Sequence, residues 1–203
     1  MRSDLYISAD VEADGPAPGP YSMLAFGLTV AGRFDGTTFD AATPRAETFY
    51  RELAPISDQC DPAALEVSGL DRDKLLREGE DPATAMDAAA AWIAKVTGTH
   101  RPVLVAWPLA YDWLFLQWYF LRFATDGSPF GFSSGLDMKT LFWRHSGGVV
   151  DAAGKEDLPP ELRPSAPHTH NALDDAVEQA EIFVRLWRAG AAGGGRLGQP
   201  MSA

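Results

Sequence analysis

The stretch LYISADVE at residues 5–12 carries the pattern that decides the fold. Apolar residues occupy every second position from Leu5 to Val11, which predicts a strand with these residues on one face. Asp10 and Glu12 share the opposite face, so their carboxylates stand side by side. Two carboxylates this close repel each other and raise each other's pKa unless they share a cation. A solvated strand face is the simpler interpretation of an isolated pair of this kind.

A second acidic residue of interest lies in the middle of the chain. Residues 103–107 predict a short buried strand, and residues 111–123 predict a helix that is apolar almost all round. Asp112 stands among these apolar residues, so it must cap a helix, pair with a cation or bind a metal. A helix cap is a plain alternative here, because aspartate is a favoured N-cap residue.

The most regular helix pattern of the chain covers residues 171–189, where apolar side chains keep the spacing of one helix face. His170 and Asp175 frame its first turn and a half. Acidic residues also favour helix N-termini for electrostatic reasons, so this pattern has a structural interpretation too. His168 lies two residues earlier, in a loop where we expect its position to be less fixed. The offset from His170 favours Asp175 over its neighbour Asp174.

The rest of the chain completes an α/β pattern. Residues 21–30 and 47–53 read as strands, and with residues 5–12 they form an antiparallel meander. Helices then alternate with a strand, which predicts a mixed sheet of about five strands, the first three antiparallel, with helices on both faces. The remaining predicted helices cover residues 61–69, 81–96 and 137–145.

The chain predicts one domain with a tail. Residues 1–189 are long enough to bury a core without disulfides, and the Gly-rich residues 190–203 predict a flexible tail. Residues 146–169 are rich in Gly, Pro and charge and predict a long loop, which in a compact domain is usually functional or disordered.

Composition narrows the functional classes. Seventeen Lys and Arg against 28 Asp and Glu give a net charge of −11, which argues against wrapping a nucleic-acid duplex. An enzyme that takes a strand end into a small pocket stays open, because bound cations reverse the local charge. The single Cys60 excludes an internal disulfide and fits a reducing cytosol. No long apolar stretch occurs, so we expect a cytoplasmic protein without a membrane segment.

Taken in order, these motifs resemble the DEDDh family of 3′–5′ exonucleases, which share the ribonuclease-H-like fold and include proofreading exonuclease subunits and oligoribonucleases. The resemblance covers residues 5–188, although Trp107-Pro108 stands where the family often has His-Asn. The segments that carry it are residues 10–12 with Gly15 for the first motif, 105–116 for the second, 170–175 for the third, and 136–141 for an Asp-containing segment between the last two.

The resemblance implies a metal-dependent hydrolase that releases nucleoside monophosphates from the 3′ end of single-stranded RNA or DNA. Four carboxylates form a hard oxygen site suited to two Mg²⁺ or Mn²⁺ ions. By analogy with the family, Asp10 bridges both metals, Glu12 and Asp175 hold the first, and Asp112 serves the second. His170 is then the general base, because histidine exchanges protons near working pH.

Substrate contacts and alternatives stay open at this point. Gly15, in the turn after the first strand, and the rings of Trp107, Tyr111 and Trp113 are candidates for binding the terminal nucleotides, because bases stack on aromatic rings. A homodimer is common among the shorter family members. The alternative functions are a catalytically idle module that binds nucleic acid or protein, and a carboxylate-rich metal phosphatase.

Overall fold

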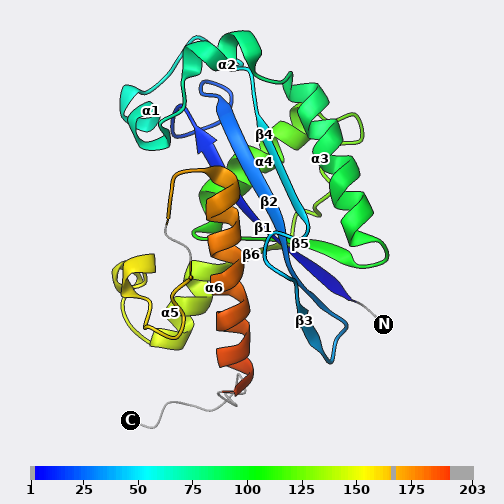
Figure 1. Ribbon diagram of the computed structural model, residues 1–203, viewed down its shortest axis with the longest axis vertical. Helices are drawn as coiled ribbons and strands as arrows, with labels where there is room; N and C mark the ends of the chain where they lie inside the picture. Colours follow the sequence, from blue (N-terminus) through cyan, green and yellow to red (C-terminus); the bar gives the residue numbers. More distant parts are fainter. Residues whose placement is uncertain (1–2, 166–167, 193–203) are drawn as a thin grey trace.

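The computed structural model describes residues 3–165 and 168–192, and within these ranges one six-stranded mixed sheet lies between two layers of helices (Figure 1). The strand order is β3-β2-β1-β5-β6, with β4 also paired to β2. The strands are β1 (Asp4–Ala13), β2 (Met23–Phe34), β3 (Phe39–Ala41), β4 (Thr48–Glu52), β5 (Arg101–Ala106) and β6 (Gly135–Asp137).

The sheet confirms the predicted mixed topology. β2 is antiparallel to β1 and to β4, which is the predicted meander, whereas β5 runs parallel to β1 and β6 parallel to β5. The carboxyl ends of β1 and β5 therefore meet at one edge of the sheet, where sites of open α/β sheets are usually built. β3 and β6 were not predicted, because three residues are too few to show a periodic pattern.

The helices cover both faces of the sheet, as predicted. Leu5 and Ile7 of β1 belong to the core under α3 and α4, whereas Tyr6 belongs to a second core under α5 and α6. This division confirms the alternation expected from the sequence. The helices are α1 (Pro62–Ser68), α2 (Arg72–Glu78), α3 (Pro82–Thr97), α4 (Leu109–Phe123), α5 (Met138–Ser146) and α6 (Ala172–Ala192).

Several predicted elements differ from the structure in their bounds or content. Helix α4 begins at Leu109 rather than at residue 111, and α2 was missed. The predicted loop 146–169 contains two 3₁₀ turns at Val150–Ala152 and Lys155–Asp157, and its apolar side chains, such as Leu158, are buried in the second core. Helix α6 continues to Ala192, so the predicted tail begins three residues too early; the rest of that tail, residues 193–203, lies outside the described residues.

The start of α6 lies directly on β2, at a glycine. A Cβ atom added to Gly27 would lie 2.5 Å from the Cα of Leu173 and would also overlap the carbonyl of Ala172. Gly27 is paired with Asp10 across the β1–β2 ladder. The missing side chain therefore lets the N-terminus of α6 lie against the part of the sheet that carries the first motif.

Among the helices that the structure describes, none combines the length and the apolar character that crossing a membrane requires.

Candidate active site

Carboxylates from three distant segments converge at the carboxyl edge of β1. Asp10 and Glu12 from β1 and Asp175 from α6 each offer an oxygen, and these oxygens lie within 4.8 Å of one another. Asp112 lies in the first turn of α4, is 4% exposed, and acts electrostatically on Asp10. Because Pro108 is the N-cap of α4, the capping interpretation of Asp112 is wrong. The structure thus brings together the four carboxylates that the sequence singled out.

The cluster holds protons more tightly than isolated carboxyl groups. Burial raises the pKa of Asp10 well above its usual value, and Asp112, Glu12 and Asp175 raise it further. Burial, with help from Asp175, raises the pKa of Glu12 to about 7. Burial also raises the pKa of Asp112 to about 8, against the effect of hydrogen bonding from the backbone of Val11. Such mutual repulsion is relieved when a cation is shared between the carboxylates.

One oxygen of the Asp175 carboxylate has no hydrogen-bond partner within the described residues. The Asp175 side chain is 0% exposed, and its Oδ1 accepts a hydrogen bond of 2.9 Å from the backbone N–H of Thr169. Its Oδ2 is buried and has no hydrogen-bond partner within the described part of the chain. A buried acceptor without a partner is costly, so this oxygen fits a bound cation. The donor set is all oxygen, which suits Mg²⁺ or Mn²⁺.

Gln179 orients the first-motif aspartate, and sequence reasoning missed it. Its amide nitrogen donates to Oδ1 of Asp10 at 2.7 Å, while its amide oxygen accepts from the backbone N–H of Trp107 at 2.6 Å. Gln179 is one turn after Asp175 on α6, so one helix face supplies both residues. The i, i+4 spacing from Asp175 was the signal that could have found it.

Lys155 is the second residue that the sequence did not indicate. Its ammonium group pairs with Glu178 at 2.7 Å, and its charge lowers the pKa of both Asp10 and Asp112. It comes from the 3₁₀ turn at Lys155–Asp157, inside the predicted loop, so the loop brings a positive charge to the acidic site. Nothing in the local pattern around Lys155 distinguishes it from a solvated lysine.

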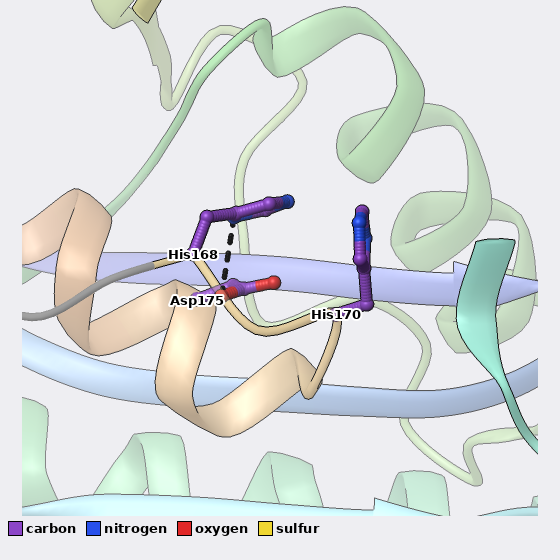
Figure 2. A group of neighbouring side chains, drawn as sticks. All are labelled: His168, His170 and Asp175. Atoms are coloured by element: carbon purple, nitrogen blue, oxygen red, sulfur yellow. Dashed lines mark ion pairs between the residues drawn. The ribbon is translucent and has the colours of Figure 1, made fainter.

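The two histidines stand together above Asp175 (Figure 2). His170 is exposed and has a φ of 58°, a left-handed conformation that non-glycine residues rarely adopt. The expectation that His168 is less fixed is wrong, because its Nδ1 lies 3.2 Å from Asp175 Oδ1 and 3.2 Å from Glu178 Oε2. Asp174 turns away from the cluster to an ion pair with Arg45, which supports the choice of Asp175.

The candidate substrate residues are placed differently from one another. Trp107 is 7% exposed and packs against Phe142 in the second core, a position that disfavours stacking on a base. Tyr111 is partly buried and donates from its hydroxyl to the carbonyl of Gly15 at 3.2 Å, which ties α4 to the turn after β1. Trp113 lines a surface pocket of about 320 Å³ between α4 and β6, together with Leu109 and Gly135.

Comparison with known proteins places this site in context. The chain is 36% identical over 186 residues to the 3′–5′ DNA exonuclease Cap18 of Escherichia coli. The alignment covers 90% of this chain and 92% of that protein. Among solved structures, the nuclease domain of 3′hExo, a DEDDh family member bound to rAMP, aligns with a TM-score of 0.67 at 15% identity over 98% of this chain and 97% of that one. The Mg²⁺- and Mn²⁺-bound form of S. pombe Pop2p aligns with a TM-score of 0.61 at 16% identity over 95% and 86% of the two chains.

Other solved structures that align with this chain belong to longer proteins. The chain spans 64% of one 3′-exonuclease and 42% of another exonuclease solved with single-stranded DNA. No protein-family profile matches the sequence.

The fold, the site and the E. coli relative together define a ribonuclease-H-like 3′–5′ exonuclease with a carboxylate-rich centre. The chain belongs to the DEDDh family of 3′–5′ exonucleases, as its motifs and its relationship to the E. coli enzyme show.

Proposed function

We propose that this chain removes nucleoside monophosphates from the 3′ end of single-stranded DNA, using two Mg²⁺ or Mn²⁺ ions and His170 as general base. The observation that carries the proposal is the convergence of Asp10, Glu12 and Asp175 within 4.8 Å, with Asp112 buried beside them. Mg²⁺ and Mn²⁺ are the ions of the Pop2p structure, and the oxygen-only donor set of this cluster suits the same ions.

Each carboxylate has a role that its position supports. Asp10 would be the ligand shared by both ions, because the other three carboxylates all act on it electrostatically and Gln179 orients it through a hydrogen bond of 2.7 Å. Glu12 and Asp175 would hold one ion, and Asp112 would hold the other. When bound, a pair of divalent cations neutralises the phosphoryl oxygens and stabilises the leaving oxygen of a phosphodiester.

His170 is placed to move a proton. It is exposed, immediately precedes α6, and its ring centroid lies 4.5 Å from that of His168. A histidine side chain in this position would take a proton from an attacking water near neutral pH. His168 is tied to two carboxylates, so it has less freedom to meet the substrate.

The substrate class rests on charge and on the E. coli relative. A net charge of −11 is unsuited to binding a long duplex through its phosphates, whereas a strand end needs few contacts. The named activity of the relative at 36% identity is on DNA, which favours DNA over RNA. Tyr111 and Gly15, joined by a hydrogen bond of 3.2 Å, lie at the start of α4 and the end of β1, next to the cluster.

Matched oligonucleotides test the proposal. Single-stranded DNA, single-stranded RNA and duplex DNA of one sequence, each labelled at the 5′ end, are incubated with Mg²⁺ or Mn²⁺ and with chelator. We expect a ladder of products shortened from the 3′ end, fastest on single-stranded DNA and absent with chelator. Asp175→Asn should stop cleavage, and the neighbouring Asp174→Asn, which loses only the ion pair to Arg45, should retain it.

Three results would count against the proposal. Binding of the oligonucleotides without any product would indicate the catalytically idle module. Hydrolysis of small phosphate esters but not of oligonucleotides would indicate the phosphatase. Equal loss of activity in both aspartate variants would contradict the assignment of Asp175 as the ligand.

A further inference from the structure

The His168 and His170 rings and the Asp175 carboxylate surround one small space. The two rings stand edge to face with centroids 4.5 Å apart, and one ligand atom from each of the three residues lies within 4.8 Å of the others. Figure 2 shows the His168 ring extending toward the His170 ring, with the carboxylate beneath. This group shares only Asp175 with the all-carboxylate cluster of Asp10, Glu12 and Asp175.

His168 is held as metal-binding histidines commonly are. Its Nδ1 lies 3.2 Å from Glu178 Oε2 and 3.2 Å from Asp175 Oδ1. A ring nitrogen that donates to a carboxylate fixes the tautomer and leaves the other nitrogen, Nε2, as a free acceptor for a metal. Glu178 is itself fixed by Lys155 at 2.7 Å, so the supporting carboxylate is in place.

The donor chemistry differs from that of the carboxylate cluster. Two imidazoles and one carboxylate suit Zn²⁺ and similar borderline ions, which bind such sets with a solvent molecule in the fourth position. Ligand atoms around tetrahedral zinc lie about 3.3 Å apart, as bonds of about 2.0–2.1 Å require. His170 is exposed, so rotation of its side chain can bring its ring nitrogen to this spacing from the other two donors. The Asp175 carboxylate, whose buried Oδ2 has no partner within the described residues, supplies the third donor.

We propose that His168, His170 and Asp175 form a second metal site, selective for Zn²⁺ or a similar borderline ion, which overlaps the hydrolytic centre at Asp175. The effect of this site on activity rests on the proposed function. An ion bound here occupies the general base and takes a ligand from the Mg²⁺ or Mn²⁺ site. Zinc is therefore an inhibitor that acts through the histidine pair.

Metal binding is measured first, without reference to activity. Co²⁺ added to the chelator-treated protein should give the visible absorption of a tetrahedral site, and Zn²⁺ should displace it. His168→Ala should abolish the absorption, and Glu178→Gln should weaken Zn²⁺ binding by about 10–100-fold, as loss of a supporting carboxylate does. Asp112→Asn is the control, because it alters only the carboxylate cluster and should keep the absorption.

Inhibition is then measured by titrating Zn²⁺ into the Mg²⁺-supported cleavage reaction. We expect the inhibition constant to rise at least about tenfold in His168→Ala, each protein being normalised to its own activity without zinc. Equal Zn²⁺ affinity and equal inhibition in the wild type and His168→Ala would overturn the inference, because zinc would then act at the carboxylates.

The two proposals fail separately. If the wild type cleaves DNA but gives no His168-dependent cobalt absorption, the second site is refuted and the exonuclease stands. If the absorption is present but no cleavage occurs with any divalent ion, the second site stands and the proposed function is refuted.

Discussion

Gly27→Ala tests whether the position of α6 on β2 sets the geometry of the site. The added Cβ would lie 2.5 Å from the Cα of Leu173, and it would also meet the backbone carbonyl of Ala172. Carbon atoms in contact lie about 3.5 Å apart, so the helix must move by about 1 Å. The overlapping atoms belong to the backbone of α6, and Gly27 itself belongs to a strand inside the sheet. Rotation of a side chain therefore cannot relieve the overlap.

The consequence for activity follows from where α6 carries its functional groups. Asp175 lies in the first turn of this helix, directly above the substitution. A displacement of about 1 Å at a catalytic group costs roughly 10²-fold in rate. Overpacking costs about 1–3 kcal/mol of stability, which is less than a typical domain's total of about 5–15 kcal/mol. We therefore expect a folded protein with kcat/KM lowered by roughly 10²-fold.

The assay is 3′-end cleavage of single-stranded DNA at saturating Mn²⁺, with circular dichroism to confirm the fold. Gly190→Ala is the matched control, because it lies in the same helix and its added Cβ would meet nothing within 4 Å. The control should keep wild-type activity. Near wild-type turnover in a folded Gly27→Ala protein would refute the argument that this contact positions the site.

Three further predictions concern the residues around the carboxylates. His170→Ala should lower kcat by about 10²–10⁴-fold, with partial rescue at high pH, whereas His168→Ala should lower kcat by less than about tenfold. pH–rate profiles of both variants under single-turnover conditions measure this. A larger loss in His168→Ala than in His170→Ala would overturn the choice of base. Folding raises the pKa of Glu12 to about 7 and that of Asp112 to about 8, whereas both are about 4 in the unfolded chain. The native state therefore binds more protons than the unfolded state between these values. The metal-free protein should lose stability as pH rises from about 5 to 8. Thermal unfolding in chelator measures this, and a Tm that rises over that range would contradict it. Gln179→Ala removes a hydrogen bond of 2.7 Å to Asp10 and should weaken Mn²⁺ binding by about 10–100-fold without unfolding the chain. Calorimetry measures the Mn²⁺ affinity. An unchanged affinity would show that Gln179 does not position Asp10.

The sequence was sufficient for most of the architecture because its long elements have clear periods. The alternation of residues 5–12 predicted which side chains of β1 face each core, and the helix pattern of residues 171–189 predicted α6 to within a few residues. Short elements escaped for a physical reason. A three-residue strand such as β6 is formed by pairing with β5, and no property of its own residues requires it.

The site could be predicted only where its members fall into ordered motifs. Asp10, Glu12, Asp112, Asp175 and His170 were all identified because their spacing resembles that of a family. Gln179 and Lys155 were not, since their roles depend on contacts between segments that are far apart in the chain. The burial of Trp107 could not be predicted, because an aromatic residue beside a motif has the same sequence pattern whether it faces a substrate or the core.

The central claim is that the convergent carboxylates act as one metal-dependent catalytic centre. Cleavage of 5′-labelled single-stranded DNA by Asp10→Asn, measured across a Mn²⁺ or Mg²⁺ titration that reaches saturation, tests it most directly. The account predicts no turnover at any metal concentration, together with an intact fold and a metal-free protein at least as stable as the wild type, because one of four repelling charges is gone. Cleavage close to the wild-type rate at saturating metal would contradict the account.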